Sequence, residues 1–426
     1  MTQTADLFLK RHGMHPDDVN MPLCCEMFMR EMQRGLAGKP STLMMLPTYV
    51  SLERRIPEGR KTAILDAGGT NLRAGVAEYR SRDFNFFDLE VCPIPGSGTP
   101  VSWEQFVSEM ADRLYPLMAQ TDRFGFCFSF PSEATEEMDG RVIEFNKEVT
   151  VRDAAGKLLC GDICEKLRQR GVQDVHFALI NDTVAALLGG YGMTCEMDYD
   201  GYIGFILGTG TNCSYLERTG RISKLPRSAA ANMIINMEAG GYGRFPTGDL
   251  DRALDQDSRN PGEHLYEKMV SGGYLGDLAQ RVLRAANAEG LFRGKLEETV
   301  LPEVCMETVS GFLMDPFEET VFSRLSDSEE DLDLIFALMD LMLDRAAKML
   351  AVNLVSILIH ADMGRDSLKP ACIIAEGSTF VKSDVYQSKI LKYAKALAET
   401  YGRYFVVLSY EDVNLKGAAT AALLAN

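Results

Sequence analysis

The sequence has no long uninterrupted apolar run. Its longest apolar helix is expected from about 331 to 360, and four charged residues interrupt it, namely Asp340, Asp344, Arg345 and Lys348. The clean stretches fall well short of the run of about 18 residues that indicates a transmembrane helix. The chain also begins without the charged and then apolar segment of a secretory signal. We therefore expect a cytoplasmic protein without a membrane partner.

A cysteine framework is also missing. The 10 cysteines are scattered, and the nearest approach to a metal-binding pattern is Cys160 with Cys164, which no further Cys or His pair accompanies. We expect reduced thiols, with neither a disulfide framework nor a structural zinc site.

Basic residues are in deficit. Lys and Arg total 44 against 61 Asp and Glu, which gives a formal net charge of -17. Such a charge repels a nucleic-acid backbone and an anionic lipid surface alike, so neither is an expected partner. An anionic ligand must instead be held locally, by backbone N–H groups, a few placed cations or a bridging metal ion.

Proline is scarce, at 16 residues, and 46% of the chain is hydrophobic, which excludes extended disorder. A length of 426 residues is too great for one ordinary core, so two lobes are expected. A strand meander is followed by alternating helices and strands, which predicts a mixed α/β fold. The expected strands are 62–67, 73–79, 84–91, 124–130, 175–181, 202–207, 212–217, 371–376 and 404–410. Helices are expected from about 103 to 114, 261 to 293, 331 to 360 and 383 to 399, with a short Ala-rich helix at the C-terminus.

A weak internal repeat joins the two halves of the chain. The string GTN occurs at 69–71 and again at 210–212, each time directly after an expected strand. This repetition predicts one hairpin in each half, with the halves facing each other across a cleft.

The first of these turns has the composition of a phosphate-binding hairpin. Its glycines bring backbone N–H groups close to phosphate oxygens, its polar side chains add donors and a cation, and its aspartate can hold the water shell of Mg²⁺. The residues are Asp66, Gly68, Gly69, Thr70, Asn71 and Arg73. An ordinary tight hairpin is the alternative. Neither a P-loop nor a GxGxxG motif between a strand and a helix occurs.

Two further glycine turns complete the expected nucleotide site. Gly208, Thr209 and Gly210 repeat the first hairpin, which favours two glycine turns that bind one polyphosphate from opposite sides. Gly377 and Ser378, after the strand at 371–376, could pack against a base or sugar, although a simple strand-to-helix turn explains them equally well.

A polar set between and after the hairpins suits a polyhydroxyl ligand, because carboxylates and amides can pair with neighbouring sugar hydroxyls. Its members are Ser129, Asn146, Lys147, Asn181, Asp182, Asn212, Glu238 and Glu267. Asp182 follows an apolar strand and is our predicted general base, although it could also be a helix N-cap. Lys147 is expected near the transferred phosphoryl group, with an ordinary exposed lysine as the alternative.

Taken together, these strings resemble the hexokinase family of sugar kinases, which includes glucokinase. Matching strings follow in order at 32–50, 65–73, 128–131, 180–183, 208–212, 236–243, 260–278 and 376–378. The resemblance implies the two-lobed actin-like ATPase fold, with a small lobe of 61–181 plus 412–426 and a large lobe of 1–60 plus 182–411.

The resemblance also implies an activity: transfer of the γ-phosphoryl group of Mg-ATP to the 6-hydroxyl of glucose or a related hexose. The family's sugar contacts fall on the polar set above apart from Asn146, and its nucleotide contacts fall on the glycine-turn residues above apart from Gly208 and Gly210. Asp182 matches the catalytic base of the family, and Asp182, Lys147 and Arg73 become the catalytic candidates. This sequence differs from the family at Asn146, Ala239, Gly273 and 413–415, where the family usually has Thr, Trp, often Lys, and Gly-Ser-Gly.

Two other functions share these hairpins. An actin-like ATPase without a sugar substrate would not need Asn181, Asp182, Glu238 and Glu267 together, and a catalytically silent sugar sensor would have lost Asp182, Lys147 or the Asp66 hairpin. A bacterial repressor-type sugar kinase would carry a cysteine-rich zinc motif that is missing here. The sequence does not specify which hexose is preferred, how the protein is regulated or whether it self-associates.

Overall fold

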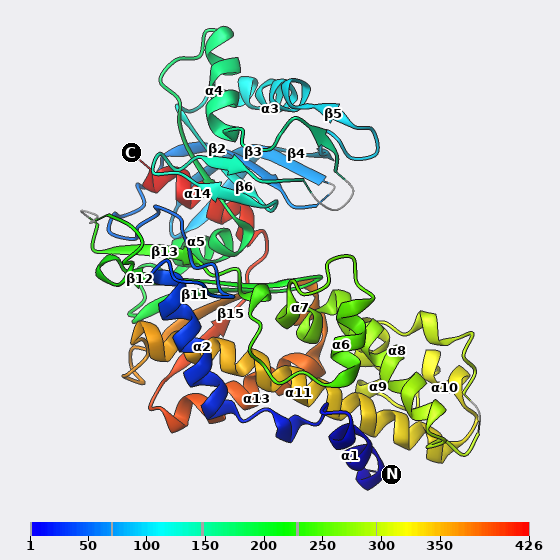
Figure 1. Ribbon diagram of the computed structural model, residues 1–426. Coiled ribbons are helices and arrows are strands. Elements are labelled where there is room, and N and C mark those ends of the chain that lie inside the picture. Colours follow the sequence, from blue (N-terminus) through cyan, green and yellow to red (C-terminus); the bar gives the residue numbers. More distant parts are fainter. Residues whose placement is uncertain (1, 70, 146–148, 227–229, 295, 426) are drawn as a thin grey trace.

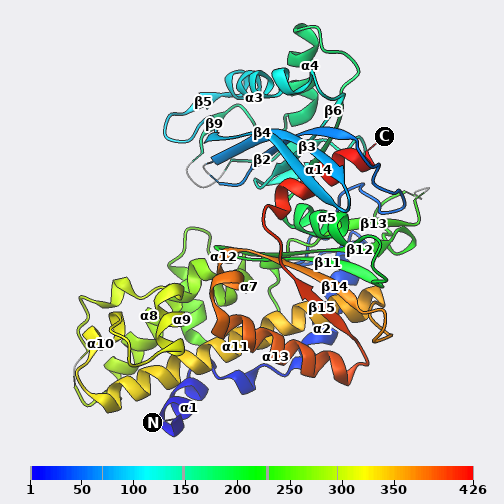
Figure 2. The same ribbon diagram turned by 180° about the vertical axis from the view of Figure 1, so that it is seen from behind.

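The structure, a computed structural model, describes residues 2–69, 71–145, 149–226, 230–294 and 296–425. It consists of two β-sheets, one above the other, with helices on their outer faces and a pair of helices between them (Figures 1 and 2). The predicted mixed α/β architecture is confirmed.

The upper sheet has five strands in the order β10-β6-β2-β3-β4. Their bounds are β2 Lys61–Ala67, β3 Asn71–Arg80, β4 Asp83–Pro93, β6 Arg123–Phe128 and β10 His176–Ile180. Strands β2, β6 and β10 are parallel, whereas β2, β3 and β4 form an antiparallel meander. The carboxyl ends of β2, β6 and β10 therefore lie at one edge of this sheet.

The lower sheet has six strands in the order β1-β13-β12-β11-β14-β15. Their bounds are β1 Leu46–Pro47, β11 Gly201–Leu207, β12 Thr211–Arg218, β13 Asn232–Asn236, β14 Ala371–Glu376 and β15 Phe405–Leu408. Strands β11 and β14 are parallel, so that Ile206 pairs with Glu376 at their common carboxyl edge. Strands β11 and β12 form the second hairpin, which repeats the β2–β3 pairing of the upper sheet.

Two helices cover the outer face of the upper sheet, α3 Trp103–Leu117 and α4 Leu159–Gln169. Ser102 caps α3 through a capping box with Gln105. Cys160 and Cys164 lie on the buried face of α4, and burial raises the pKa of Cys164 to about 12. The short strands β5 Val101–Ser102, β7 Ser132–Ala134, β8 Gly140–Val142 and β9 Val151–Arg152 complete this lobe.

Helices α5, Asp182–Thr194, and α14, Val413–Leu424, form the layer between the sheets. Glycines let them pack backbone to backbone, because a Cβ on Gly417 would lie 1.9 Å from the carbonyl oxygen of Ala185. A Cβ on Gly125 of β6 would lie equally close to the carbonyl oxygen of Ala418, at 1.9 Å. The C-terminal helix is thus fixed against both the upper sheet and α5.

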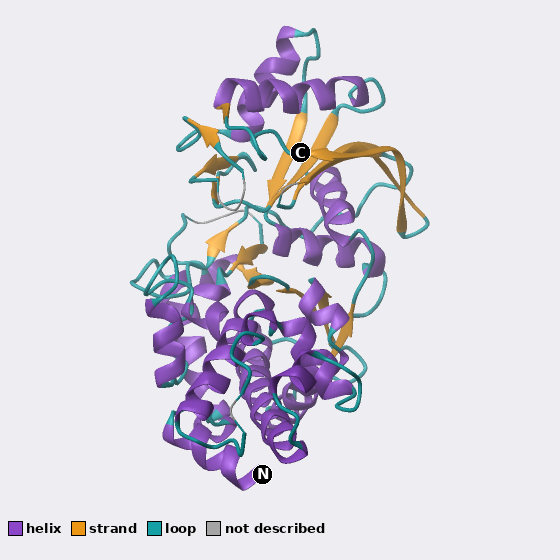
Figure 3. Cartoon of the chain, turned by 90° about the vertical axis from the view of Figure 1, so that its right-hand side faces the viewer, coloured by secondary structure: helices purple, strands orange, loops and turns teal. Residues whose placement is uncertain are grey.

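The remaining helices surround the lower sheet, mainly on the side away from α5 (Figure 3). The longest, α11 Glu329–Ala361, runs through the centre of this core. The others are α1 Thr2–Arg11, α2 Met21–Leu36, α6 Asp249–Gln256, α7 Leu265–Val270, α8 Gly272–Ala288, α9 Met306–Met314, α10 Val321–Leu325, α12 Ser378–Lys382 and α13 Asp384–Thr400, with 3-10 turns η1 Pro16–Asp18, η2 Thr219–Arg221, η3 Ala239–Gly241 and η4 Leu301–Glu303. Among the described residues, we find no helix that combines the length and apolarity needed to cross a bilayer.

The structure differs from the sequence-based prediction in two details. The helix expected over 261–293 is two helices, because Ser271 has an extended backbone between α7 and α8. Strand β13 was not predicted. The division into lobes at residue 181, which falls between β10 and α5, stays a prediction.

Candidate active site

The first glycine turn joins β2 to β3 at the carboxyl edge of the upper sheet. Asp66 and Arg73 are direct partners across this hairpin. Gly69 has a φ of +99°, a conformation that glycine adopts readily, and among the described residues no atom beyond its chain neighbours lies within 4 Å of where its Cβ would be. Asn71, the first residue of β3, is exposed. This glycine therefore leaves open space at the turn.

The second and third glycine turns contact each other. The carbonyl oxygen of Gly208 accepts hydrogen bonds from the Gly272 N–H and the Thr379 hydroxyl, both at 2.9 Å. A Cβ on Gly377, whose φ is +110°, would lie 2.4 Å from the carbonyl oxygen of Leu207. The turn at 208–210 is thus packed between the start of α8 and the start of α12, next to Ser378.

The start of α8 leaves no room for side chains. A Cβ on Gly273 would lie 2.6 Å from the carbonyl oxygen of Thr209, to which the Gly273 N–H already donates at 3.1 Å. Glycine at this position, where the family often has Lys, therefore allows the backbone of α8 to bind the second turn directly.

Buried Asp66 and partly exposed Arg73 form an ion pair beneath the first turn. The Nε and Nη2 of Arg73 donate to Asp66 Oδ2 at 2.9 and 2.5 Å, and its Nη1 donates to Asp412 Oδ1 at 2.8 Å. Burial opposes the charge on Arg73, but Asp66 outweighs it and raises the pKa of the guanidinium. Asp66 Oδ1 is buried and has no hydrogen-bond partner among the described residues.

Asn181 and Asp182 lie where β10 leads into α5. Asn181 is the N-cap, with its Oδ1 accepting from the Thr183 N–H at 2.8 Å. Asp182 is instead the first helical residue, so the expectation that it could be the N-cap is wrong. Its Oδ1 accepts from the Thr183 N–H at 2.7 Å and from the Thr183 hydroxyl at 3.3 Å. The carboxylate is thus held at the N-terminus of α5 by the residue that follows it.

Glu267, Asn212 and Glu238 come together on the lower side. Glu267 Oε2 accepts from the Thr211 N–H at 3.0 Å. A Cβ on Gly210 or Gly240 would lie 2.5 or 3.1 Å from the same oxygen. Asn212 Oδ1 accepts from the N–H of Ala239, the residue after Glu238, at 3.0 Å. Three of the predicted sugar-binding side chains are therefore adjacent, although they come from β12, α7 and the segment after β13.

Electrostatic interactions connect the two sides through Asp182. Burial raises the pKa of Glu238, and the negative charges of Asp182 and Glu267 raise it further, while Asn236 and His264 oppose this. Burial also raises the pKa of Glu376, and Asp182 and Asp66 contribute to that shift. Asp182 thus lies within electrostatic reach of Glu238 on one side and of Glu376 on the other.

The other predicted residues divide into two groups. Ser129 follows β6 and lies near Asp66, because a Cβ on Gly68 would be 3.8 Å from Asp66 Oδ1 and 3.9 Å from Ser129 Oγ. Thr70, Asn146 and Lys147 lie outside the described residues.

Sequence reasoning missed Glu376, Asp412 and Asn236. Glu376 directly precedes Gly377 and Ser378, the two residues of this turn that were predicted to contact the nucleotide. Asp412 directly precedes α14, and Asn236 ends the unpredicted strand β13. Their proximity to the site depends on contacts between distant segments, which no local pattern reveals.

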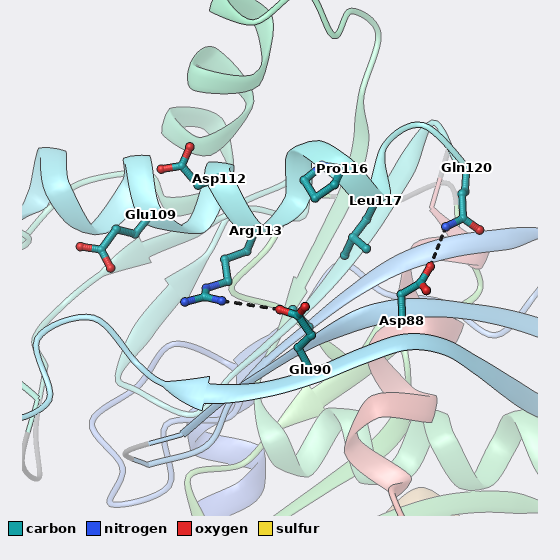
Figure 4. Close-up of a pocket in the computed structure, with 9 residues that line it drawn as sticks. Asp88, Glu90, Glu109, Asp112, Arg113, Pro116, Leu117 and Gln120 are labelled. Atoms are coloured by element: carbon teal, nitrogen blue, oxygen red, sulfur yellow. Dashed lines mark hydrogen bonds and ion pairs between the residues drawn. The ribbon is translucent and has the colours of Figure 1, made fainter.

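A groove elsewhere on the protein has the wrong charge for a phosphate. It has a volume of about 530 Å³ and lies between α3 and β4 (Figure 4). Ala74 of β3 lines it, so the groove is on the face of the upper sheet opposite the adjacent residue Arg73. Its carboxylates outnumber its single cation, Arg113, which pairs with Glu90 at 3.7 Å. The carboxylates are Asp88, Glu90, Glu109 and Asp112. The three glycine turns, not this groove, provide a setting for an anionic ligand.

Comparison with known proteins agrees with the sequence resemblance. Two hexokinase family models match this chain, one over residues 11–191 and the other over 202–424. Hexokinase-1 of Spinacia oleracea is 32% identical over 374 residues, which cover 80% of this chain and 73% of that protein. Hexokinase-7 of Oryza sativa subsp. japonica is 32% identical over 383 residues, which cover 81% and 80%.

A solved structure, the hexokinase of Schistosoma mansoni complexed with glucose, superposes with a TM-score of 0.79 at 22% identity, covering 99% of each chain. The fold is accordingly the two-lobed actin-like ATPase fold of sugar kinases. The chain belongs to the hexokinase family. Its activity is that of a sugar kinase, a phosphotransferase with a sugar as acceptor.

Proposed function

We propose that the protein transfers the γ-phosphoryl group of Mg-ATP to the 6-hydroxyl of glucose or a related hexose, with Asp182 as the base. The observation that carries this proposal is the position of Asp182, which follows β10 and begins α5 at the same carboxyl edge of the upper sheet as Asp66. Its negative charge also acts on both Glu238 and Glu376. A carboxylate within reach of both proposed sites would orient and deprotonate the attacking hydroxyl.

The sugar would be held by the polar side chains around Asp182. Ser129, Asn181, Asn212, Glu238 and Glu267 lie at the ends of strands or the starts of helices that face this region. Each sugar hydroxyl donates one hydrogen bond and accepts others, so carboxylates and amides can satisfy adjacent hydroxyls in pairs. Asn146 and Lys147 complete the proposed set from outside the described residues.

The triphosphate would lie between the glycine turns. Gly68, Gly69 and Asn71 would offer donors from one hairpin, and Thr209 and Gly210 would offer them from the other, next to Gly377 and Ser378. The Gly208 N–H is already used within the second turn, where it donates to the Gly210 carbonyl oxygen at 2.9 Å. Arg73 supplies positive charge, which stabilises the transferred phosphoryl group because phosphoryl transfer depends mainly on positioning and electrostatics.

Asp66 is the residue that fits a magnesium ion carried by the nucleotide. Within the part of the chain that the structure describes, its Oδ1 is buried without a hydrogen-bond partner, whereas its Oδ2 is occupied by Arg73. A carboxylate oxygen suits the water shell of Mg²⁺, a cation that keeps several of its waters. The ion would supply charge neutralisation at the phosphates, and Asp66 would orient its water ligands.

An assay of ADP release tests the proposal, with glucose, mannose, fructose and N-acetylglucosamine compared as acceptors. Asp182→Asn should lower kcat by roughly 10² to 10⁴-fold while glucose still binds, because the base is lost but most sugar contacts remain. Near-wild-type turnover in Asp182→Asn would remove the assignment of the base. ADP release that no sugar stimulates would instead favour an ATPase, and glucose binding without turnover would favour a silent sensor.

A further inference from the structure

Asn236 connects two of the proposed sugar-binding residues. Asn212 Nδ2 lies 2.8 Å from Asn236 Oδ1, and Asn236 Nδ2 lies 2.7 Å from Glu238 Oε1. The three side chains therefore form a continuous relay from β12 to the segment that follows β13.

Backbone donors fix the direction of this relay. Asn212 Oδ1 accepts from the N–H groups of Cys213 at 2.7 Å and Ala239 at 3.0 Å. Since a backbone N–H can only donate, the other end of the Asn212 amide must be its NH₂ group, which donates to Asn236 Oδ1. Asn236 must then donate through its Nδ2, and Glu238 Oε1 accepts this hydrogen bond.

Asn236 also holds the backbone of Glu238. The Glu238 N–H points to Asn236 Oδ1 at 3.4 Å, and Glu238 has a left-handed φ of +53°. Asn236 itself is 6% exposed and pairs with Leu46 of β1 and Ser214 of β12. Asn236, which is fixed between two strands, therefore contacts both the backbone N–H and the side-chain carboxylate of Glu238.

The charges around Glu238 make this contact important. Asp182 from α5 and Glu267 from α7 are both negative and, together with burial, raise the pKa of Glu238. The hydrogen bond from Asn236 acts in the opposite direction, as does His264 at the start of α7. Without the Asn236 donor, a proton on Glu238 would be favoured, and the carboxylate would lose acceptor capacity toward a sugar hydroxyl.

We propose that Asn236 is a positioning residue for the sugar, which holds Asn212 and Glu238 in one fixed arrangement and keeps the Glu238 carboxylate as an acceptor. This rests on the sugar-binding roles proposed above for Asn212 and Glu238. Because the relay acts before and during phosphoryl transfer alike, it affects sugar binding more than the chemical step.

The test is Asn236→Asp, which keeps the shape and replaces the donating NH₂ with an oxygen. Asn232→Asp is the matched control on the same strand, because Asn232 uses its Oδ1 to accept from Ser51 and Leu52 and an aspartate retains that acceptor. Asn236→Asp should raise the KM for glucose roughly 10-fold to 100-fold, with the KM for ATP unchanged and kcat changed by less than about threefold. The pH below which the KM for glucose climbs should also move upward, whereas Asn232→Asp should resemble the wild type.

Unchanged KM for glucose and an unchanged pH profile in Asn236→Asp would overturn the proposal. Equal losses for glucose and ATP together with a lower Tm would also overturn it, because they indicate a purely structural role. If Asn236→Asp does not fold, Asn236→Ala removes the donor without adding charge and is judged by the same measurements.

Glu238→Gln separates this proposal from the proposed function. A wild-type KM for glucose in Glu238→Gln would contradict the sugar site itself. A raised KM in Glu238→Gln but not in Asn236→Asp would contradict only the relay. When both are raised, the double variant should lose much less than the product of the two single effects, since both changes remove one coupled unit.

Discussion

The guanidinium of Arg73 on β3 bridges two carboxylates that are far apart in the sequence. It binds Asp66 with two nitrogens, and its Nη1 binds Asp412, 339 residues away, at 2.8 Å. Asp66 is buried and Asp412 is half exposed, at 5% and 45% of their side-chain surface. Asp66 therefore binds Arg73 more firmly than Asp412 does. Of the two carboxylates, only the exposed Asp412 is easily replaced by a ligand.

Arg73→Met should lower kcat/KM for ATP by about 10²-fold, because a positioned cation next to the phosphates is lost. Asp412→Asn should act in the opposite direction and lower the KM for ATP by up to about fivefold, since an exposed ion pair contributes at most about 1 kcal/mol. Initial rates at varied ATP and saturating glucose measure both effects. A higher KM for ATP in Asp412→Asn would show that Asp412 helps to bind the nucleotide and does not compete with it.

Gly69 provides a second test of the nucleotide site. Gly69→Ala should raise the KM for ATP far more than the KM for glucose, because its Cβ would enter the open space above the first turn. The φ of +99° adds strain of about 1 kcal/mol, which must be separated from loss of binding.

Gly171→Ala is the matched control for this strain. Gly171 has a φ of +89° and also has nothing within 4 Å of a Cβ, but it lies in the loop between α4 and β10. Both variants should lose similar stability in thermal unfolding, and only Gly69→Ala should lose affinity for ATP. Parallel losses of ATP and glucose affinity in Gly69→Ala would mean that the first turn has a structural role alone.

The hairpins were predictable because their signals are local. Each consists of two apolar runs joined by a short glycine turn, and β2 with β3 and β11 with β12 pair as the repeated GTN string suggests. Asp66 and Arg73 lie seven residues apart across the first turn, so the hairpin alone makes them partners.

The rest of the site required long-range contacts. Asn236 ends a strand of only five residues, and its role emerges when β13 pairs with β12 and brings Glu238 next to Asn212. The same holds for Glu376, which approaches Asp66 and Asp182 only when the two sheets face each other. Sequence spacing cannot reveal such neighbours, because strand order and lobe packing decide them.

Gly210 tests the sugar side. A Cβ at Gly210 would lie 2.5 Å from Glu267 Oε2, so Gly210→Ala must displace this carboxylate from the Thr211 N–H. A charge-assisted hydrogen bond contributes about 1.5 to 3 kcal/mol, so the KM for glucose should rise roughly 10-fold or more. Gly220→Ala, where nothing lies within 4 Å of a Cβ, is the control and should leave the KM unchanged. Wild-type affinity for glucose in Gly210→Ala would argue against a sugar contact by Glu267.

At the nucleotide side, we expect the negative charge of Glu376 to lower the stability of the folded protein. Burial first, and then Asp182 and Asp66, raise its pKa, so the folded protein retains a proton that the unfolded chain releases above about pH 4.3. Stability contributed by this group is therefore lost as the pH rises from there through the higher folded pKa. Glu376→Gln removes the charge, keeps an acceptor and should raise Tm at pH 7.5 in the absence of nucleotide, with no difference near pH 4. Exposed Glu318→Gln is the control. Equal Tm values for wild type and Glu376→Gln at pH 7.5 would show that neighbouring groups already compensate the Glu376 charge.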